Sequence, residues 1–258
     1  MAPLKLLQEI QVRSEGSVDA KDQWYMIAAV AMAAAGAGPD VAELYQMVTK
    51  GMSLPDEKHV QRRLKEAVLK TSILYGVPRS LQALLPLFAT LKEEQIDHYG
   101  PRFVLVDDLM ERQILTMFHL RTEALKNGET SAERRERGRR HFDTLWTPAA
   151  AQSNRDKNFK YQPDLYLLNL EAIYEQWLSE DTILNAVETQ MCTTAALICS
   201  GSPQQAMWHT RGIVRHGGSI EMARFAQGIA LDIGQAYGCK VDNVVKADYI
   251  DYDDRTPH

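Results

Sequence analysis

The most apolar stretch of the sequence runs from Tyr25 to Gly38 and reads YMIAAVAMAAAGAG. It is shorter than the roughly 20 apolar residues that a membrane-spanning helix needs. Its many alanines favour a helix, and their small side chains let neighbouring helices approach closely. Gly36, Gly38 and Pro39 end this helix. We therefore expect a tightly packed helix, placed either in the ordinary core or at an interface between repeats or subunits.

Helical periodicity continues along the chain, and no segment alternates with the period of two that is typical of strands. Glycine and proline divide the pattern, most clearly at Gly201-Ser202-Pro203, where Ser202 is placed to cap the helix that follows. We predict an all-α protein. Its expected helices are 21–36, 40–51, 56–75, 79–95, 102–127, 163–178, 184–200, 203–216 and 219–236.

Two segments depart from this pattern. Residues 128–162 open with a charged run from Glu133 to His141 and continue through a polar stretch, which predicts a short helix followed by a linker. The arginines of that run form either a solvated helix face with Glu–Arg pairs or an anion site. The tail, 240–258, is acidic and too polar for a core. We expect it to be a disordered end or an arm that packs on a neighbouring subunit.

Composition limits the class of protein. The chain has 258 residues, of which 45% are hydrophobic, so it can bury one large core or two small ones. A net charge of −5 makes nucleic acid an unsuitable partner. Three cysteines are too few for a disulfide-stapled secreted fold. We expect no membrane partner and a cytoplasmic location, with the mitochondrion as the alternative.

The sequence repeats weakly. Residues 48–53 (VTKGMS) parallel residues 214–219 (VRHGGS), and a Tyr-Gly pair follows each copy, at Tyr75 and Tyr237. Two packed copies of one helical unit would explain an all-α chain of this length. We therefore divide the chain into a first repeat with a long central helix (1–127), a charged helix and linker (128–162), a second repeat (163–239) and the acidic tail (240–258).

Three stretches resemble the carboxymuconolactone decarboxylase and alkylhydroperoxidase D-like superfamily. Residues 64–79 (LKEAVLKTSILYGVPR) are similar to its E-x-(L/I)-L-x-T-x-x-Y-x-G-x-P signature, with the Tyr and Gly adjacent here. Residues 137–174 resemble the R-G-x-x-x-F…P-D-L…Y linker of two-repeat members. Residues 188–217 resemble the pattern that carries a Glu, an Ala-Ala-Leu and a His. The resemblance implies a bundle of two tandem helical repeats that assembles into a homo-oligomer.

The family contains thiol peroxidases with a Cys-x-x-Cys pair and decarboxylases without it. Cys192 and Cys199 are two helical turns apart, too far to bridge on one helix. The two motif positions for the thiols hold Ser202 and Gln205. The resemblance therefore favours the decarboxylase branch. A one-cysteine role for Cys199 stays as an alternative to its being a small buried core residue.

His209 occupies the histidine position of the motif, and Glu188 occupies its acidic position. Imidazole moves protons readily near neutral pH, and a carboxylate beside it would fix its tautomer. We expect the corner at 201–203 to place Glu188 beside His209, although His209 could equally be an interfacial or capped histidine. In the first repeat Glu43 replaces the histidine, so the second repeat is the one expected to be catalytic.

Further side chains are expected to hold the substrate. Glu66 and Tyr75 come from the first-repeat motif, where Tyr75 would hold an oxygen by a hydrogen bond or simply pack. Arg211 suits a substrate carboxylate, although two residues' separation from His209 points it away on an ideal helix. Gln205 and Trp208 are the remaining candidates for the pocket wall.

His119 and His216 have no partner at the spacing of a metal site, and no H-x-x-x-H or E-x-x-H pattern occurs. No phosphate-binding glycine loop is present either, so we expect neither metal nor cofactor. The sequence predicts a cofactor-free decarboxylase or isomerase. It would move a proton on a small lactone, keto acid or conjugated cyclic acid. The alternatives are a thiol-dependent enzyme that handles hydroperoxides, or a non-catalytic binding or assembly module of the same fold.

Overall fold

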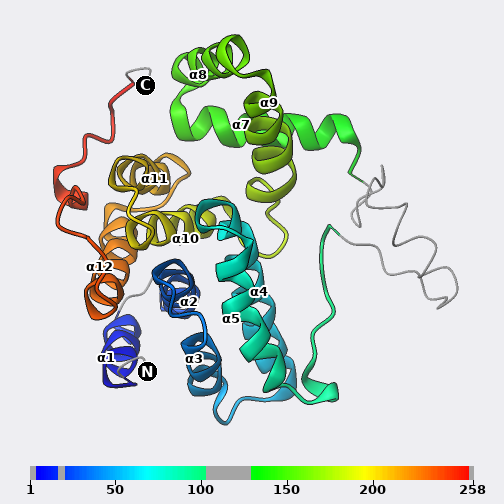
Figure 1. Cartoon of the computed structure of the whole chain (residues 1–258), viewed down its shortest axis with the longest axis vertical. Helices are drawn as coiled ribbons and strands as arrows, with labels where there is room; N and C mark the ends of the chain where they lie inside the picture. Colours follow the sequence, from blue (N-terminus) through cyan, green and yellow to red (C-terminus); the bar gives the residue numbers. More distant parts are fainter. Residues whose placement is uncertain (1–3, 17–20, 103–128, 256–258) are drawn as a thin grey trace, which may run out of the picture.

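The computed structural model of the chain describes residues 4–16, 21–102 and 129–255 (Figure 1). Within these ranges every regular element is a helix, which confirms the predicted all-α bundle. The expected helix at 102–127 lies outside the described residues, apart from Arg102. Of the described helices, none combines the length and apolarity that crossing a membrane would require.

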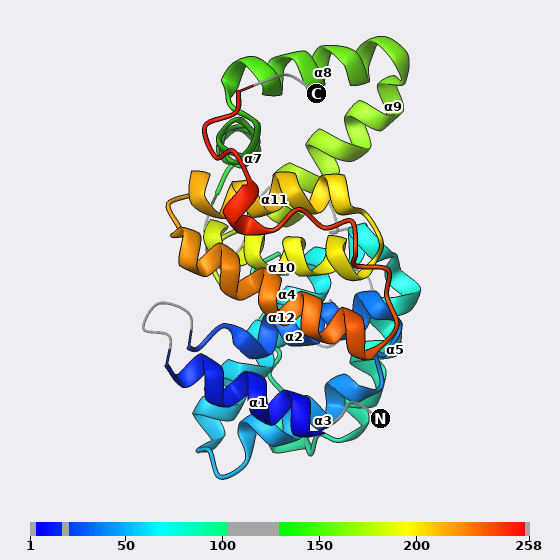
Figure 2. The same cartoon turned by 90° about the vertical axis from the view of Figure 1, so that its left-hand side faces the viewer.

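Two helices form the centre of the bundle, α2 (Trp24–Ala35) and α10 (Ala186–Cys199). Every residue of α2 from Trp24 to Ala34 is buried, as is α10 from Glu188 to Cys199. They pack against each other, and α4 (Leu54–Tyr75) and α12 (Ile220–Ala236) pack against both (Figure 2). The alanine-rich stretch is thus core of the folded chain, because it provides the surface on which both halves meet.

The chain turns after each central helix at a glycine with positive φ, Gly36 at 84° and Gly201 at 79°. A side chain at such a φ would be strained, so glycine fits both corners. The helices α3 (Asp40–Thr49) and α11 (Pro203–Arg215) follow these corners, and α4 and α12 come next. The order of helices is therefore the same in the two halves. That the halves are copies of one unit stays a prediction.

Two N-terminal features were not expected. Helix α1 (Leu4–Glu15) buries Leu7 and Ile10 and packs against α2, with Arg13 paired to Asp232 of α12 at 2.7 Å. Helix α5 (Val77–Ala89) ends earlier than expected, before the short turn η1 (Glu93–Gln95).

The predicted linker is largely helical. Helix α7 (Ser131–Trp146) is followed by α8 (Pro148–Tyr161), α9 (Pro163–Tyr166) and the wide helix η2 (Leu167–Leu178). A second, smaller core joins them around Phe142, Leu145, Trp146, Ala151, Leu170, Tyr174 and Leu178. Helix α8 was not predicted, because most of its surface faces solvent and its sequence is therefore polar. In the charged run, Arg137 pairs with Glu129 and bonds Ser179, whereas Arg139 and Arg140 are exposed.

A buried lysine joins α4 to the segment between η2 and α10. Lys70 is 1% exposed. Its Nζ donates to Thr189 Oγ1 at 2.8 Å, to the Leu178 and Leu184 carbonyls at 3.2 and 3.3 Å, and to the Glu180 carbonyl. Burial lowers the pKa of Lys70 to about 8. The ammonium is therefore solvated by protein oxygens in place of water.

The C-terminal tail packs on its own chain, across α11 and α12 (Figure 2). Val241, Ala247 and Ile250 are buried, and Gln227 of α12 bonds the Val245 carbonyl and the Ala247 amide. Further along, Asp254 pairs with Arg211 at 3.0 Å. The tail is thus a packed part of the fold that covers α11 and α12 of the second half.

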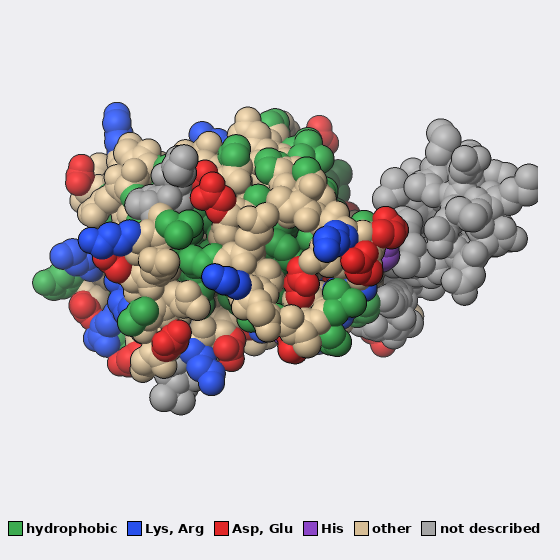
Figure 3. Space-filling model, turned by 90° about the horizontal axis from the view of Figure 1, so that it is seen from below, with side chains coloured by type: hydrophobic (Ala, Val, Ile, Leu, Met, Phe, Trp, Pro, Cys, Tyr) green, Lys and Arg blue, Asp and Glu red, His purple; other side chains and the backbone are tan. Residues whose placement is uncertain are grey.

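Surface charge is mixed on the face seen from below, where acidic and basic side chains alternate around hydrophobic ones (Figure 3). A continuous basic surface suited to a phosphate backbone is absent from the described residues of this face.

Candidate functional site

His209 lies on α11 and is buried against α10. Its Nδ1 lies 2.8 Å from Gln190 Oε1 and 3.0 Å from Thr193 Oγ1. An amide oxygen only accepts hydrogen bonds, so Nδ1 carries the proton and Nε2 the lone pair. Gln190, which the sequence analysis did not single out, is the residue that fixes the tautomer of His209.

Glu188 does not occupy that position. It is the third residue of α10, where it closes a capping box with Asn185, and its Oε1 pairs with Arg63 of α4. Residues two apart on a helix point about 200° apart, so Gln190 faces His209 while Glu188 faces α4. The expected contact between Glu188 and His209 was therefore wrong in its geometry. Their catalytic roles stay predictions.

Two further histidines lie near His209, of which His141 is buried and His216 is half-buried. The Nε2 of His141, on α7, lies 3.2 Å from Gln190 Nε2, and its ring lies 4.4 Å from the ring of His216. Gly212 lets α11 lie close to Gln190, because a Cβ at that position would lie 2.9 Å from Gln190 Oε1. Burial lowers the pKa of His209 and of His216 to about 4, and lowers that of His141 well below its usual range. The three imidazoles are therefore neutral at pH 7.

Acid should destabilise the protein between pH 6.5 and about 4. In this window the unfolded histidines bind protons that the folded ones exclude, so stability present above pH 6.5 is lost as the pH falls. For His209, whose folded pKa is about 4, the loss reaches about 3 kcal/mol near pH 4. Urea unfolding at several pH values measures it. Carboxylates also titrate here, so the test is whether His209→Asn shows a shallower pH dependence than wild type; equal slopes would contradict the prediction.

The other predicted site residues do not gather around His209. Glu66 accepts two bonds from Arg102, at 2.7 and 3.0 Å, and Tyr75 bonds Thr71 of its own helix. Burial raises the pKa of Tyr75 to about 12. Of the α11 residues, Gln205 is exposed, Trp208 packs edge-on to Trp146 at 4.9 Å, and Arg211 holds the tail through Asp254. Their assignment to a substrate pocket stays a prediction.

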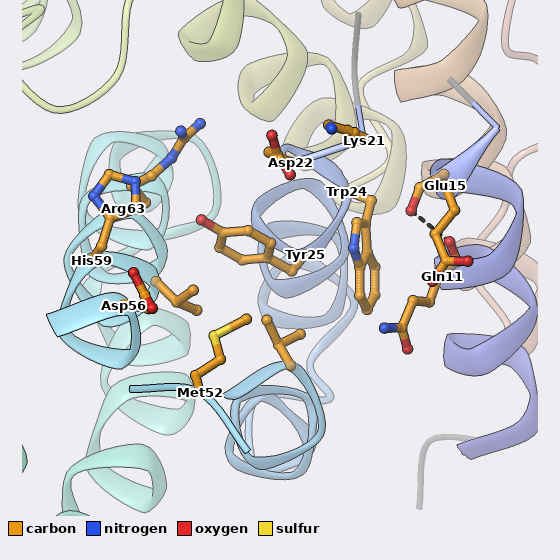
Figure 4. A pocket seen from close by; sticks show the side chains of 13 residues that line it. Gln11, Glu15, Lys21, Asp22, Trp24, Tyr25, Met52, Asp56, His59 and Arg63 are labelled. Atoms are coloured by element: carbon orange, nitrogen blue, oxygen red, sulfur yellow. Dashed lines mark hydrogen bonds between the residues drawn. The ribbon is translucent and has the colours of Figure 1, made fainter. Parts of the chain in front are cut away.

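An open pocket of about 480 Å³ lies elsewhere, between α1, α2 and α4 (Figure 4). The hydroxyl of Tyr25 points from α2 toward α4, where His59 and Arg63 lie one helical turn apart. Trp24 lies on the side of α1. The charged and polar lining residues also include Gln11, Ser14, Glu15, Lys21, Asp22 and Asp56. This arrangement brings an imidazole, a phenol and a guanidinium to one cavity.

Arg63 links the pocket to Glu188. Its Nε donates to Met26 Sδ at 3.4 Å, and its Nη2 donates to Glu188. Among the described residues these bonds use two of the five guanidinium N–H groups, so donors remain for a ligand. Tyr25 is 5% exposed, and burial raises its pKa above the usual range, so the phenol stays protonated.

Tyr25, His59 and Arg63 were not among the site residues predicted from the sequence. Tyr25 starts the alanine-rich stretch and was interpreted only as part of an apolar helix. His59 and Arg63 share one face of α4, a spacing visible in the sequence, but α1 closes the pocket and was itself unexpected. Only tertiary packing reveals this site.

No family model and no solved structure matches the chain. Two curated proteins do, and both are named Peroxisomal protein 2. The one from Saccharomyces cerevisiae is 25% identical over 182 residues, which cover 70% of this chain and 64% of that protein. The one from Schizosaccharomyces pombe is 23% identical over 176 residues, covering 68% and 70%. The chain is thus similar to two proteins named for the peroxisome, and its match spans less than two thirds of the first.

Proposed function

We propose that the protein is a cofactor-free enzyme that moves a proton on a small lactone acid, keto acid or conjugated cyclic acid. The observation that supports this proposal is the meeting of His59, Tyr25 and Arg63 in one pocket. These three groups supply what enolisation of a carbonyl acid needs, which is a proton carrier, a donor to the enolate oxygen and a cation for the carboxylate.

Each residue has a separate role in the proposal. Arg63, with Lys21 nearby in the lining, binds the carboxylate by charge-assisted hydrogen bonds. Tyr25 donates to the carbonyl oxygen as it becomes an enolate. His59 removes the proton from the adjacent carbon and returns it to the product. Glu188 is a positioning residue, because its carboxylate holds the guanidinium of Arg63.

The proposal keeps the decarboxylase-like branch of the family but moves the chemistry from the second half to the first. Two observations support the move. His209 is buried in a neutral network whose Nδ1 is bonded to Gln190, and Glu188 faces Arg63. An exposed imidazole in an open pocket is better placed to meet a dissolved substrate than a buried one.

The test is proton exchange in deuterium oxide, followed by NMR. We expect the protein to exchange the acidic C–H protons of at least one carbonyl acid in a panel of lactone acids, keto acids and conjugated cyclic acids. The methyl ester of the same compound serves as the matched control, because it lacks the charge that Arg63 binds. Exchange of the acid but not of the ester supports the proposal. Absence of exchange across the panel favours the non-catalytic alternative.

We also propose a peroxisomal location, in place of the cytoplasmic or mitochondrial one expected from the sequence. The names of the two relatives support it. Separate fusions of a fluorescent protein to each end, imaged with a peroxisomal marker, test it; diffuse or mitochondrial signal from both fusions would refute it.

Homo-oligomerisation stays a proposal, supported by an exposed apolar stripe on α5. Val77, Leu81 and Leu85 follow one another at four-residue spacing, and Phe88 lies on the same face. A sedimentation measurement that gave a monomer at micromolar concentration would argue against it.

A further inference from the structure

Two cysteines that are far apart in the sequence meet at one end of the central helix α10. Cys199 is its last residue, and Cys239 follows the end of α12 by three positions. The two helices pack together, and Cys199 Sγ and Cys239 Cβ both lie against Gly234 of α12, so that each thiol shifts the pKa of the other. The pair is reduced in this structure.

The surrounding backbone holds both side chains against Gly234. The Cys199 thiol donates to the Ala230 carbonyl at 3.3 Å, and the Cys239 amide donates to the Gly234 carbonyl at 2.8 Å. A Cβ at Gly234 would lie 3.5 Å from Cys199 Sγ and 3.6 Å from Cys239 Cβ. The packing of α10 on α12 therefore places the two cysteine side chains beside each other.

The two thiols differ in accessibility and acidity. Cys199 is 5% exposed, and the hydrogen bond to Cys239, together with burial, raises its pKa well above the usual range. Cys239 is only half-buried, and its bond from Cys199 lowers its pKa to about 7, with help from the charge of Arg79. Cys239 is thus the more reachable sulfur and the one that more readily forms the thiolate, which is the form that attacks disulfides.

We propose that Cys199 and Cys239 form a redox-active dithiol that exchanges with small disulfides such as oxidised glutathione. In the first step the Cys239 thiolate attacks one sulfur of the disulfide, which forms a mixed disulfide and releases one glutathione thiolate. In the second step Cys199 loses its proton to solvent and attacks the Cys239 sulfur, which releases the second glutathione. Two protein thiols are oxidised and one glutathione disulfide is reduced. Excess reduced glutathione reverses both steps.

This site is separate from the pocket of His59 and does not rest on the proposed acid/base function. It also differs from the one-cysteine role considered for Cys199, because Cys239 supplies the nucleophile. From the sequence, only Cys192 and Cys199, which share a helix, were considered as a pair. In the structure the neighbour of Cys199 is Cys239, which follows the end of α12.

The test equilibrates the native full-length protein with glutathione buffers of increasing oxidised fraction. Acid quenching, alkylation after denaturation and peptide mass analysis then follow each cysteine. We expect a Cys199–Cys239 disulfide, returned to two thiols by excess reduced glutathione. Cys192 is the internal control, because burial raises its pKa to about 12 and it should stay alkylatable throughout.

Variants separate the two steps. Cys199→Ala should trap glutathione on Cys239 as a stable mixed disulfide, whereas Cys239→Ser should leave Cys199 unmodified. The proposal is overturned if wild type also accumulates the mixed disulfide with Cys199 still free. It is likewise overturned if Cys239 reacts no faster than Cys192 in the folded protein.

Discussion

Replacement of His59 by asparagine is expected to slow proton exchange on the best substrate by about 100- to 10,000-fold, the usual contribution of a positioned acid or base. Asparagine keeps the size and polarity of the side chain but cannot carry the proton. His59 is exposed at the pocket, so its loss should leave folding intact. NMR exchange rates measured at saturating substrate report the loss.

His209→Asn is the matched control, since both changes remove one imidazole. If the pocket of Tyr25 and Arg63 is the site, His209→Asn should change the exchange rate by less than about tenfold once the folded fraction is matched. The reverse result, with His209 essential and His59 dispensable, would move the chemistry to the buried His209. Arg63→Met should mainly raise KM, because it removes the group that binds the carboxylate.

Lys70→Met is expected to destabilise the protein by about 3 to 5 kcal/mol. Methionine fills a similar volume, so packing changes little. The change instead leaves four buried oxygens, those bonded by Lys70 Nζ, without their shared donor. Each unsatisfied acceptor costs about 1 kcal/mol or more. Urea unfolding at pH 7 measures the difference.

The control for Lys70 is Lys58→Met on the same helix. Lys58 is partly exposed, so its replacement should alter the free energy of unfolding by less than about 0.5 kcal/mol. If the two changes had equal effects, the hydrogen bonds of Lys70 Nζ to the four surrounding oxygens would add nothing to stability.

The fold was predictable wherever the spacing of hydrophobic residues and the helix-ending glycines and prolines indicated the same helix boundaries. The alanine-rich stretch of α2 and the corner after α10 are such places, and the predicted helices there end within a few residues of the observed ones. Hydrophobic periodicity does not predict α8, because a helix that buries only one narrow edge has the composition of a polar linker. Hydrophobic periodicity also fails to predict α1, because its two main buried side chains are buried only by packing against α2.

The candidate site was less predictable, because it depends on angles between helices. Spacing along the chain correctly brought α10 beside α11, yet it could not tell that Gln190 and not Glu188 faces His209. A shift of two positions along one helix reverses the side that a residue faces. Arg63 and Glu188, like Cys199 and Cys239, come from segments that are distant in the sequence, so no local sequence pattern predicts that they meet.

The mutual burial of α2 and α10 makes the two halves of the chain interdependent. Separation of the halves would expose the apolar faces that α2 and α10 bury against each other. We therefore expect the two halves to unfold together in a single cooperative transition.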